Sequence, residues 1–231
     1  WAVAKKNSKG YDDAAILEKV KSALLKIKSG EAVYERDSVV FDKIEYSWPL
    51  LASLMWVAAS SKGRLNVLDF GGSLGSSYFQ NRILLSTLKH VQWNIVEQKH
   101  FVEAGRKYFE DENLKFYYDI ESCINEKSPN SILFSSVIQY IEKPLELLKK
   151  IKSIGFEYIV FDRTGFVNSG KDRLTVQIVP SAIYPCSYPC WFFDRKKFYS
   201  FFEDKYEVIA SFEASDKTNL PATFEGSILR M

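Results

Sequence analysis

Residues 67–76 read Val-Leu-Asp-Phe-Gly-Gly-Ser-Leu-Gly-Ser, an apolar strand that runs into a glycine-rich turn. Glycine at such a strand-to-helix turn lets the backbone bend tightly and lets a ligand lie against the main chain. Asp69, at the tip of the strand, is a poor neighbour for the negative pyrophosphate of a dinucleotide, but it suits a ligand with a cationic amino or sulfonium group. The residues predicted to bind this ligand are Asp69, Gly71, Gly72, Ser73 and Gly75.

Strand-like and helix-like segments alternate around this turn. Strands are expected at Leu65–Phe70, Trp93–Glu97, Lys115–Tyr118, Ser131–Ser135 and Tyr158–Asp162, with helices at Ser76–Lys89, Lys99–Phe109 and Pro144–Ile154. Such alternation predicts βαβ units and a parallel sheet covered on both faces. Tyr206–Phe212 and Phe224–Met231 have no helical pattern between them, so we expect them to pair antiparallel. The predicted fold is α/β: a Rossmann-like doubly wound sheet, mostly parallel with an antiparallel last strand.

The first 61 residues predict an N-terminal helical extension. One helix is expected from Asp12 to the stop signal at Gly30, and another over Trp48–Ser60, with a proline in its first turn. Residues 31–47 read as loop-like. We therefore expect two parts, a helical cap on the substrate side over residues 1–61 and a cofactor-binding domain over residues 62–231.

An acidic residue lies at the end of the next predicted strand, and another lies just after the strand that follows it. Glu97 lies about 20 residues after Gly75, the spacing at which an acid accepts hydrogen bonds from the ribose hydroxyls of a bound nucleotide. Asp119 is placed to accept a hydrogen bond from an adenine amine, with Ile120 packing on the ring. A solvated strand-end carboxylate is the alternative interpretation of Glu97.

These residues resemble the class I S-adenosylmethionine-dependent methyltransferases over about residues 62–231. The family's glycine-rich first motif is similar to residues 69–75, its ribose acid to Glu97 and its adenine motif to Asp119 and Ile120. The resemblance implies S-adenosylmethionine as the cofactor and S-adenosylhomocysteine as the product. It also implies a last strand inserted antiparallel.

Residues 135–144 resemble the family's exit from the fourth strand. There we expect Ser135 and Ser136 to bind the cofactor and Tyr140 to bind the substrate. Gln139 and Tyr140 replace the glutamate and histidine of many small-molecule methyltransferases, which excludes a histidine base at that place. The proline-proline-aromatic motif of amino-methylating DNA enzymes is absent there, which argues against methylation of a nucleic-acid base.

A finer resemblance is to an uncharacterised bacterial branch of methyltransferases often associated with surface-polysaccharide gene clusters. Its members carry elements similar to Trp48–Ala52 and to residues 184–191, which read Tyr-Pro-Cys-Ser-Tyr-Pro-Cys-Trp. We interpret the second element as a stiff, proline-punctuated loop whose aromatic side chains form a wall for a sugar. The alternative is that these aromatic side chains have only a structural role in packing. The predicted substrate-binding residues are Tyr140, Tyr184, Tyr188 and Trp191.

Asp162 and Arg163 end the fifth predicted strand. Ligands of an open parallel sheet lie beyond the carboxyl ends of its strands. We therefore hypothesise that Asp162 is a base or an orienting carboxylate and that Arg163 contacts an acidic or polar group of the substrate. An internal ion pair between the two is the alternative.

The composition limits the classes of molecule that this chain is expected to bind. The 31 basic and 29 acidic side chains leave a net charge of +2, so no electrostatic excess favours nucleic acid or an anionic membrane. With three cysteines and two histidines, we expect no metal site and reduced cysteines in a cytoplasmic protein. The longest apolar run, Trp48 to Ala59, is about a dozen residues, well short of the ~20 needed to span a membrane.

The sequence therefore predicts an S-adenosylmethionine-dependent methyltransferase that acts on a small or carbohydrate-like acceptor, at oxygen, in bacterial polysaccharide biosynthesis. One alternative is an NAD(P)-dependent oxidoreductase, which Asp69 and the final strands disfavour. Another is a catalytically degenerate fold that binds the cofactor and serves as a partner of other enzymes. The oligomeric state stays open, with a homodimer as one candidate.

Overall fold

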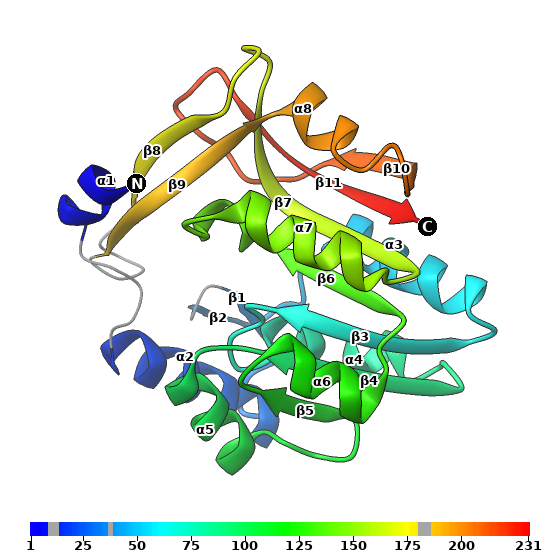
Figure 1. Ribbon diagram of the computed structural model, residues 1–231. Coiled ribbons are helices and arrows are strands. Elements are labelled where there is room, and N and C mark those ends of the chain that lie inside the picture. The colour runs from blue at the N-terminus through cyan, green and yellow to red at the C-terminus, as the bar shows by residue number, and fades with distance from the viewer. Residues whose placement is uncertain (9–13, 37–38, 180–185) are drawn as a thin grey trace. The chain divides into compact units, whose positions relative to one another are not determined.

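The computed structural model describes residues 1–8, 14–36, 39–179 and 186–231, and Figure 1 shows the course of the chain. The chain divides into two compact units. We call residues 12–131 and 182–184 the glycine-turn unit, and residues 1–11, 132–181 and 185–231 the hairpin unit.

The glycine-turn unit contains five helices and five strands among its described residues. They are α2 (Ala14–Ser29), β1 (Tyr34–Arg36), β2 (Val39–Phe41), α3 (Trp48–Ser60), β3 (Arg64–Phe70), α4 (Ser76–Leu85), β4 (His90–Val96), α5 (Lys99–Tyr108), β5 (Leu114–Tyr117) and α6 (Ile120–Lys127). Helix α3 starts where predicted because Pro49 fits the first turn of a helix, which needs no N–H there. The loop predicted over residues 31–47 is wrong in part, since β1 and β2 pair antiparallel. Strands this short show no alternation in the sequence.

Strands β3, β4 and β5 lie side by side and parallel. Figure 1 shows α6 in front of them and α3 and α4 behind, and this cover on both faces explains why successive residues in these strands are buried. Trp93, Phe101 and Phe116 are at most 1% exposed and form part of the core. Parallel pairing brings the carboxyl ends of the three strands to one edge, so the residues that follow each strand lie along that edge.

The hairpin unit contains the remaining elements. They are α1 (Ala2–Lys6), β6 (Ser131–Ser135), the 3₁₀ turn η1 (Ile138–Tyr140), α7 (Pro144–Ile154), β7 (Tyr158–Val167), β8 (Arg173–Ile178), β9 (Ser187–Asp194), α8 (Arg195–Ser200), β10 (Glu207–Glu213) and β11 (Thr223–Arg230). Helix α7 has the predicted bounds, because Pro144 opens it and Gly155 closes it in the left-handed conformation, at φ +78°.

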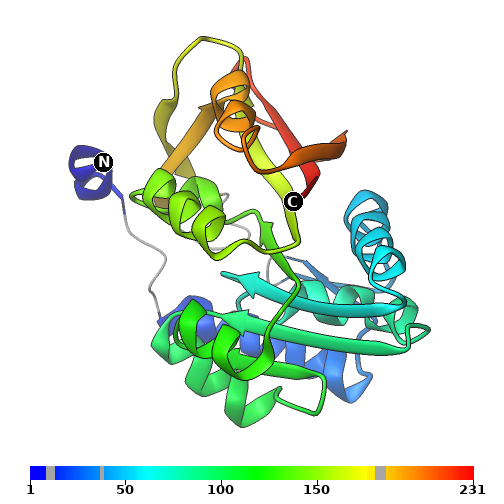
Figure 2. The same ribbon diagram turned by 45° about the vertical axis from the view of Figure 1, so that its right-hand side comes forward.

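The strand order in the hairpin unit is β6-β7-β11-β10. Strand β11 runs antiparallel to both β7 and β10, and Figure 2 shows β10 and β11 side by side in orange and red. Residues 214–222 contain no helix that could carry the chain across for parallel pairing. The predicted fold class, an α/β Rossmann-like sheet that is mostly parallel with an antiparallel last strand, is confirmed.

The aromatic segment before α8 is a strand, so the loop predicted there is wrong for residues 187–194. Strand β9 pairs antiparallel with β8 and meets β7 only through its last residues. A proline in such a strand is tolerated because one side of most of the strand carries no ladder. Pro189 therefore wrongly indicated a loop in the sequence. Both faces of β9 are largely buried, which also hid the alternation.

In the part of the chain that the structure describes, no helix is both long and apolar enough to cross a membrane.

Candidate functional site

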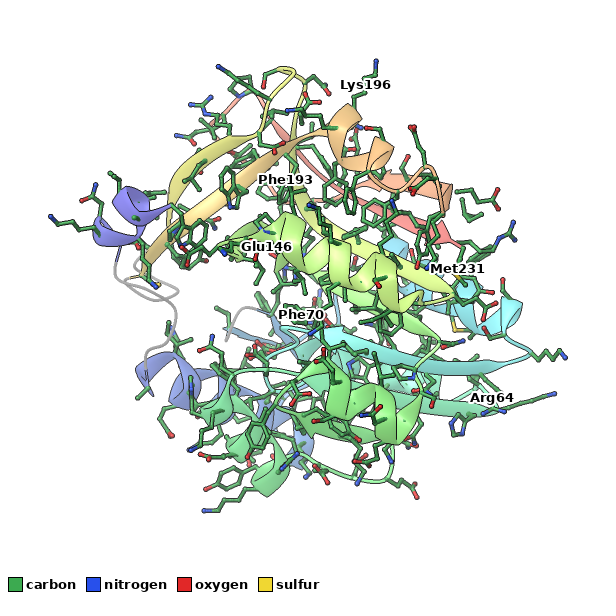
Figure 3. The ribbon with its side chains drawn as sticks, in the orientation of Figure 1. Arg64, Phe70, Glu146, Phe193, Lys196 and Met231 are labelled. Carbon is green, nitrogen blue, oxygen red and sulfur yellow. The ribbon has the colours of Figure 1, made fainter. Side chains whose placement is uncertain are left out.

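The glycine turn connects β3 to α4. Figure 3 labels Phe70, the last residue of β3, after which the turn begins. Gly71 and Gly75 have φ angles of +71° and +99°, in the left-handed region that glycine adopts without strain, and Ser73 lies there too, at +54°. The Gly71 N–H donates to the Val96 carbonyl at 2.9 Å, which ties the turn to the end of β4.

Asp69 lies directly beneath this turn. Its side chain is buried and accepts a hydrogen bond from the Trp93 indole N–H at 2.9 Å. A Cβ atom on Gly72 would lie 2.5 Å from Asp69 Oδ2, closer than real Cβ contacts allow. The carboxylate therefore sets a space that only glycine fits at position 72.

Glu97 follows β4 and joins the end of that strand to the turn. Its Oε1 accepts a hydrogen bond from the Ser73 N–H at 3.2 Å, and its Oε2 accepts one from the Gln98 N–H at 2.6 Å. The Ser73 hydroxyl beside it is buried, and none of the described residues offers it a hydrogen bond. The Ser73 hydroxyl and the Glu97 carboxylate could therefore each hydrogen-bond to a polar group of a ligand.

Asp119 follows β5 and caps α6. Its two carboxylate oxygens accept hydrogen bonds from the Ser122 N–H at 2.7 Å and the Ser122 hydroxyl at 2.9 Å. The side chain is exposed, whereas the next residue, Ile120, is only 4% exposed. The capping bonds hold Asp119 in one orientation at the end of the strand.

A second group of predicted residues meets in the hairpin unit. The Ser135 hydroxyl donates to Asp162 Oδ2 at 2.6 Å. Arg163 Nε lies 3.3 Å from the same oxygen, and an Arg163 terminal nitrogen lies 3.3 Å from the Ser135 hydroxyl. Asp162 is 2% exposed, so its charge is paired inside the protein. We call these three residues the Ser135–Asp162–Arg163 cluster.

Asp162 and Arg163 lie on a β-bulge, not at a strand end, whereas Ser135 is the last residue of β6. The prediction that β7 ends at Asp162 is wrong, because β7 continues to Val167 and pairs with β11 on both sides of an irregularity. Two residues, Asp162 and Arg163, face the single residue Gly226, where a Cβ atom would lie 2.6 Å from the Phe161 carbonyl oxygen. A bulge re-aims side chains, and here it turns both of them toward Ser135.

Tyr140 and Tyr188 pack against each other. Their ring centroids are 4.8 Å apart in a T-shaped arrangement, and the Tyr140 hydroxyl donates to Gln177 Oε1 at 3.0 Å. Burial raises the pKa of Tyr140, so its hydroxyl stays protonated. The structure thus brings together two of the aromatic residues predicted to bind substrate.

Trp191 does not join them. Side chains alternate along β9, so Trp191 lies on the opposite face from Tyr188, and it stacks on Trp1 with ring centroids 6.3 Å apart. Tyr184 lies outside the described residues.

Two side-chain contacts of these residues were not predicted from the sequence. Trp93 reads as ordinary strand core, yet its indole N–H holds Asp69. Gln139 drew notice only for the residue it replaces, yet it donates to the Arg163 carbonyl at 2.9 Å. The available signal was that a lone amide in an apolar run needs hydrogen-bond partners when buried. Among the described residues, no three His, Cys, Asp or Glu side chains gather closely enough to hold a metal ion.

No protein-family model matches the chain, and no curated protein matches it in sequence. Solved structures do resemble it. The crystal structure of the N-terminal domain of EvdMO1 in the presence of SAH and D-fucose has a TM-score of 0.55 at 13% identity, and the similarity covers 95% of this chain and 97% of that one. A SAM-dependent methyltransferase from Leishmania major has a TM-score of 0.51 at 13% identity, covering 94% and 82%. The glycopeptide N-methyltransferase MtfA complexed with SAH has a TM-score of 0.52 at 10% identity, covering 78% and 86%.

The chain has a Rossmann-like methyltransferase fold. The last strand of the chain, β11, lies between β7 and β10 and runs antiparallel to both. The strand arrangement and the similar structures thus both show this fold.

Proposed function

We propose that this chain is an S-adenosylmethionine-dependent methyltransferase that methylates a small or carbohydrate-like acceptor at oxygen. The observation that carries the proposal is the bond between the Ser73 N–H and Glu97 Oε1. It holds the acid after one strand beside the glycine turn after the strand before it, and an acid at this position binds ribose hydroxyls in Rossmann-like folds.

The residues around the turn fit this cofactor. Gly72 leaves bare main chain above Asp69, where a Cβ atom has no room. The Ser73 hydroxyl, which is without a partner among the described residues, can bind a polar group of the ligand. In this proposal Glu97 accepts the ribose hydroxyls, Asp119 accepts from the adenine amine, and Gly71 and Gly75 shape the turn.

S-adenosylmethionine supplies an activated methyl group on a sulfonium, so the protein's part is to position the acceptor and to take its proton. Asp162 is the proposed base. Its Oδ2 accepts hydrogen bonds from Ser135 and Arg163, which leaves Oδ1 to accept the proton of the acceptor hydroxyl. The Arg163 guanidinium offsets negative charge that develops on the acceptor oxygen.

Aromatic rings favour a carbohydrate-like acceptor in this proposal. The Tyr140–Tyr188 pair offers a stiff apolar face with a hydroxyl at its edge. The similar EvdMO1 domain was crystallised in the presence of D-fucose. A net charge of +2 gives no support for nucleic acid as the acceptor. The resemblance to the bacterial branch adds surface-polysaccharide assembly in the cytoplasm as the proposed setting.

The proposal is tested by methyl transfer from labelled S-adenosylmethionine to pools of nucleotide sugars and oligosaccharides, read as the mass gain of one methyl group. Wild-type protein should methylate one member of these pools. Asp162→Asn keeps the size of the side chain but weakens the base, and it should lower kcat by about 100-fold or more. Turnover by Asp162→Asn equal to that of wild type would remove Asp162 as the base.

A further inference from the structure

One buried amide side chain has no role in the function proposed above. Gln139 has 0% of its surface exposed and lies in η1, between β6 and α7. Burying an amide is unfavourable unless its polar atoms are hydrogen-bonded. Its contacts therefore indicate why an amide is present there.

Gln139 is held by its N–H groups. Its Nε2 donates to the Arg163 carbonyl at 2.9 Å and, at a longer 3.4 Å, to the Ser136 hydroxyl. Its Oε1 is buried and accepts no hydrogen bond from any residue that the structure describes. The side chain thus keeps an unpaired oxygen inside the protein in order to place its two donors.

Both residues that Gln139 contacts have an unusual backbone conformation. Ser136 and Arg163 lie in the left-handed region, at φ +53° and +52°. The Ser136 N–H donates to the Asp162 carbonyl at 2.9 Å, so Ser136 is also bonded to the residue that precedes Arg163. Residues other than glycine stay in this region only where their surroundings hold them.

The Arg163 carbonyl accepts the hydrogen bond from Gln139 at the bulge of β7. Asp162 and Arg163 together face Gly226 in the register between β7 and β11. The Gln139 amide therefore donates to the backbone at the irregular position of this strand. Relaxation of φ at this residue would turn the guanidinium away from Asp162 and Ser135.

We propose that Gln139 is a positioning residue: its amide fixes the bulge at Arg163 and thereby holds the guanidinium on Asp162 and Ser135, where the acceptor is bound. This inference rests on the proposed function for the role of the cluster. The contact between Gln139 and Arg163 can be tested without it.

Three variants separate this role from simple packing. Gln139→Met keeps the length of the side chain, removes the donor and also removes the unpaired oxygen, so it is expected to fold. Gln139→Glu places an acceptor against the Arg163 carbonyl and regains a donor only when it is protonated. Gln80→Met is the matched control, since the Gln80 amide also donates to a main-chain carbonyl, that of Glu35 at 2.7 Å, in the other unit.

The first measurement is water exchange of the Arg163 Nε–H group by ¹⁵N NMR, with the signal assigned by its loss in Arg163→Lys. We expect exchange to be faster by about tenfold or more in Gln139→Met and unchanged in Gln80→Met, because local opening exposes the group. The second is steady-state methyl transfer. In Gln139→Met kcat should fall about tenfold with the KM for S-adenosylmethionine unchanged, and the kcat of Gln139→Glu relative to wild type should rise as pH is lowered.

Unchanged exchange of the Arg163 group in both Gln139 variants would overturn the inference, as would an equal change in Gln80→Met. Faster exchange together with a fall in kcat supports it. Faster exchange in a protein that transfers no methyl group, wild type included, would support the contact and refute the proposed function. The two ideas therefore fail separately.

Discussion

The carboxylate of Asp69 lies against the glycine turn, next to Gly72. The sequence predicted that this charge faces a cationic group of a ligand, and in the structure its side chain is buried and bonded to the Trp93 indole. The identity of the acid could be predicted, because an acid at a strand tip before glycines is a local pattern. Its partner could not, because Trp93 comes to Asp69 from the neighbouring strand only through the register of the sheet.

Replacing Gly72 by alanine tests this contact. A Cβ atom there would lie 2.5 Å from Asp69 Oδ2, so Gly72→Ala should shift the turn, destabilise the fold by about 1–3 kcal/mol and weaken S-adenosylhomocysteine binding. Asp69→Ala removes the obstructing oxygens, so the double variant should lose less stability than the sum of the two single losses. Urea denaturation of the four proteins measures this coupling. If the two losses of stability simply add, the Asp69 side chain does not restrict the space at position 72.

Strand β9 shows how an element can be hidden in a sequence. Pro189 indicated a loop inside the strand, and the buried residues on both of its faces removed the alternation by which a strand is recognised. By contrast β6, α3 and α7 were predicted with the bounds observed, because each has a distinct start or stop residue or a compact apolar run. The separation of Trp191 from Tyr188 follows from β9 being a strand and could not be predicted from a loop.

Burial of the cysteines gives a pH-dependent prediction at this scale. Burial raises the pKa of the Cys190 thiol, in β9, to about 12, and burial reinforced by Glu126 raises that of Cys123, in α6, to about 12. Thiols in the unfolded chain ionise near pH ~8.5. The buried neutral thiols therefore stabilise the fold below that pH, and the contribution is lost as the pH rises toward 12.

A thiol reagent measures the burial that raises these pKa values. Native protein at pH 8 should react slowly at Cys123 and Cys190, whereas all three cysteines of the chain should react at once in denaturant. Rapid reaction of Cys190 in the folded protein would contradict the packing of β9 described above.

At the scale of the whole molecule, the fold class was predictable because it follows from the alternation of strands and helices. The places of Asp69 at the end of β3 and of Glu97 just after β4 were predictable for the same reason. The contacts of the Ser135–Asp162–Arg163 cluster depend on a bulge in β7. One extra residue in a strand leaves no mark in a single sequence.

The N-terminal residues contribute to the core, which bears on the predicted boundary after residue 61. Leu24, Leu54 and Val57 are at most 1% exposed, and burying each such side chain stabilises a fold by about 1.5–3 kcal/mol. A chain of residues 62–231 should therefore be insoluble or unfolded by circular dichroism. A soluble, cooperatively folding 62–231 chain would instead support a separate domain.

The central claim, that the glycine turn and Glu97 bind S-adenosylmethionine, is tested most directly by calorimetric titration of the protein with S-adenosylhomocysteine and, separately, with NAD. We predict binding of S-adenosylhomocysteine, no heat with NAD, and an affinity lowered at least about 30-fold in Glu97→Gln, which loses the charged acceptor of two hydroxyls. Glu103→Gln, on the exposed side of α5, should bind as wild type does. Binding of NAD, or S-adenosylhomocysteine affinity unchanged in Glu97→Gln, would contradict the account.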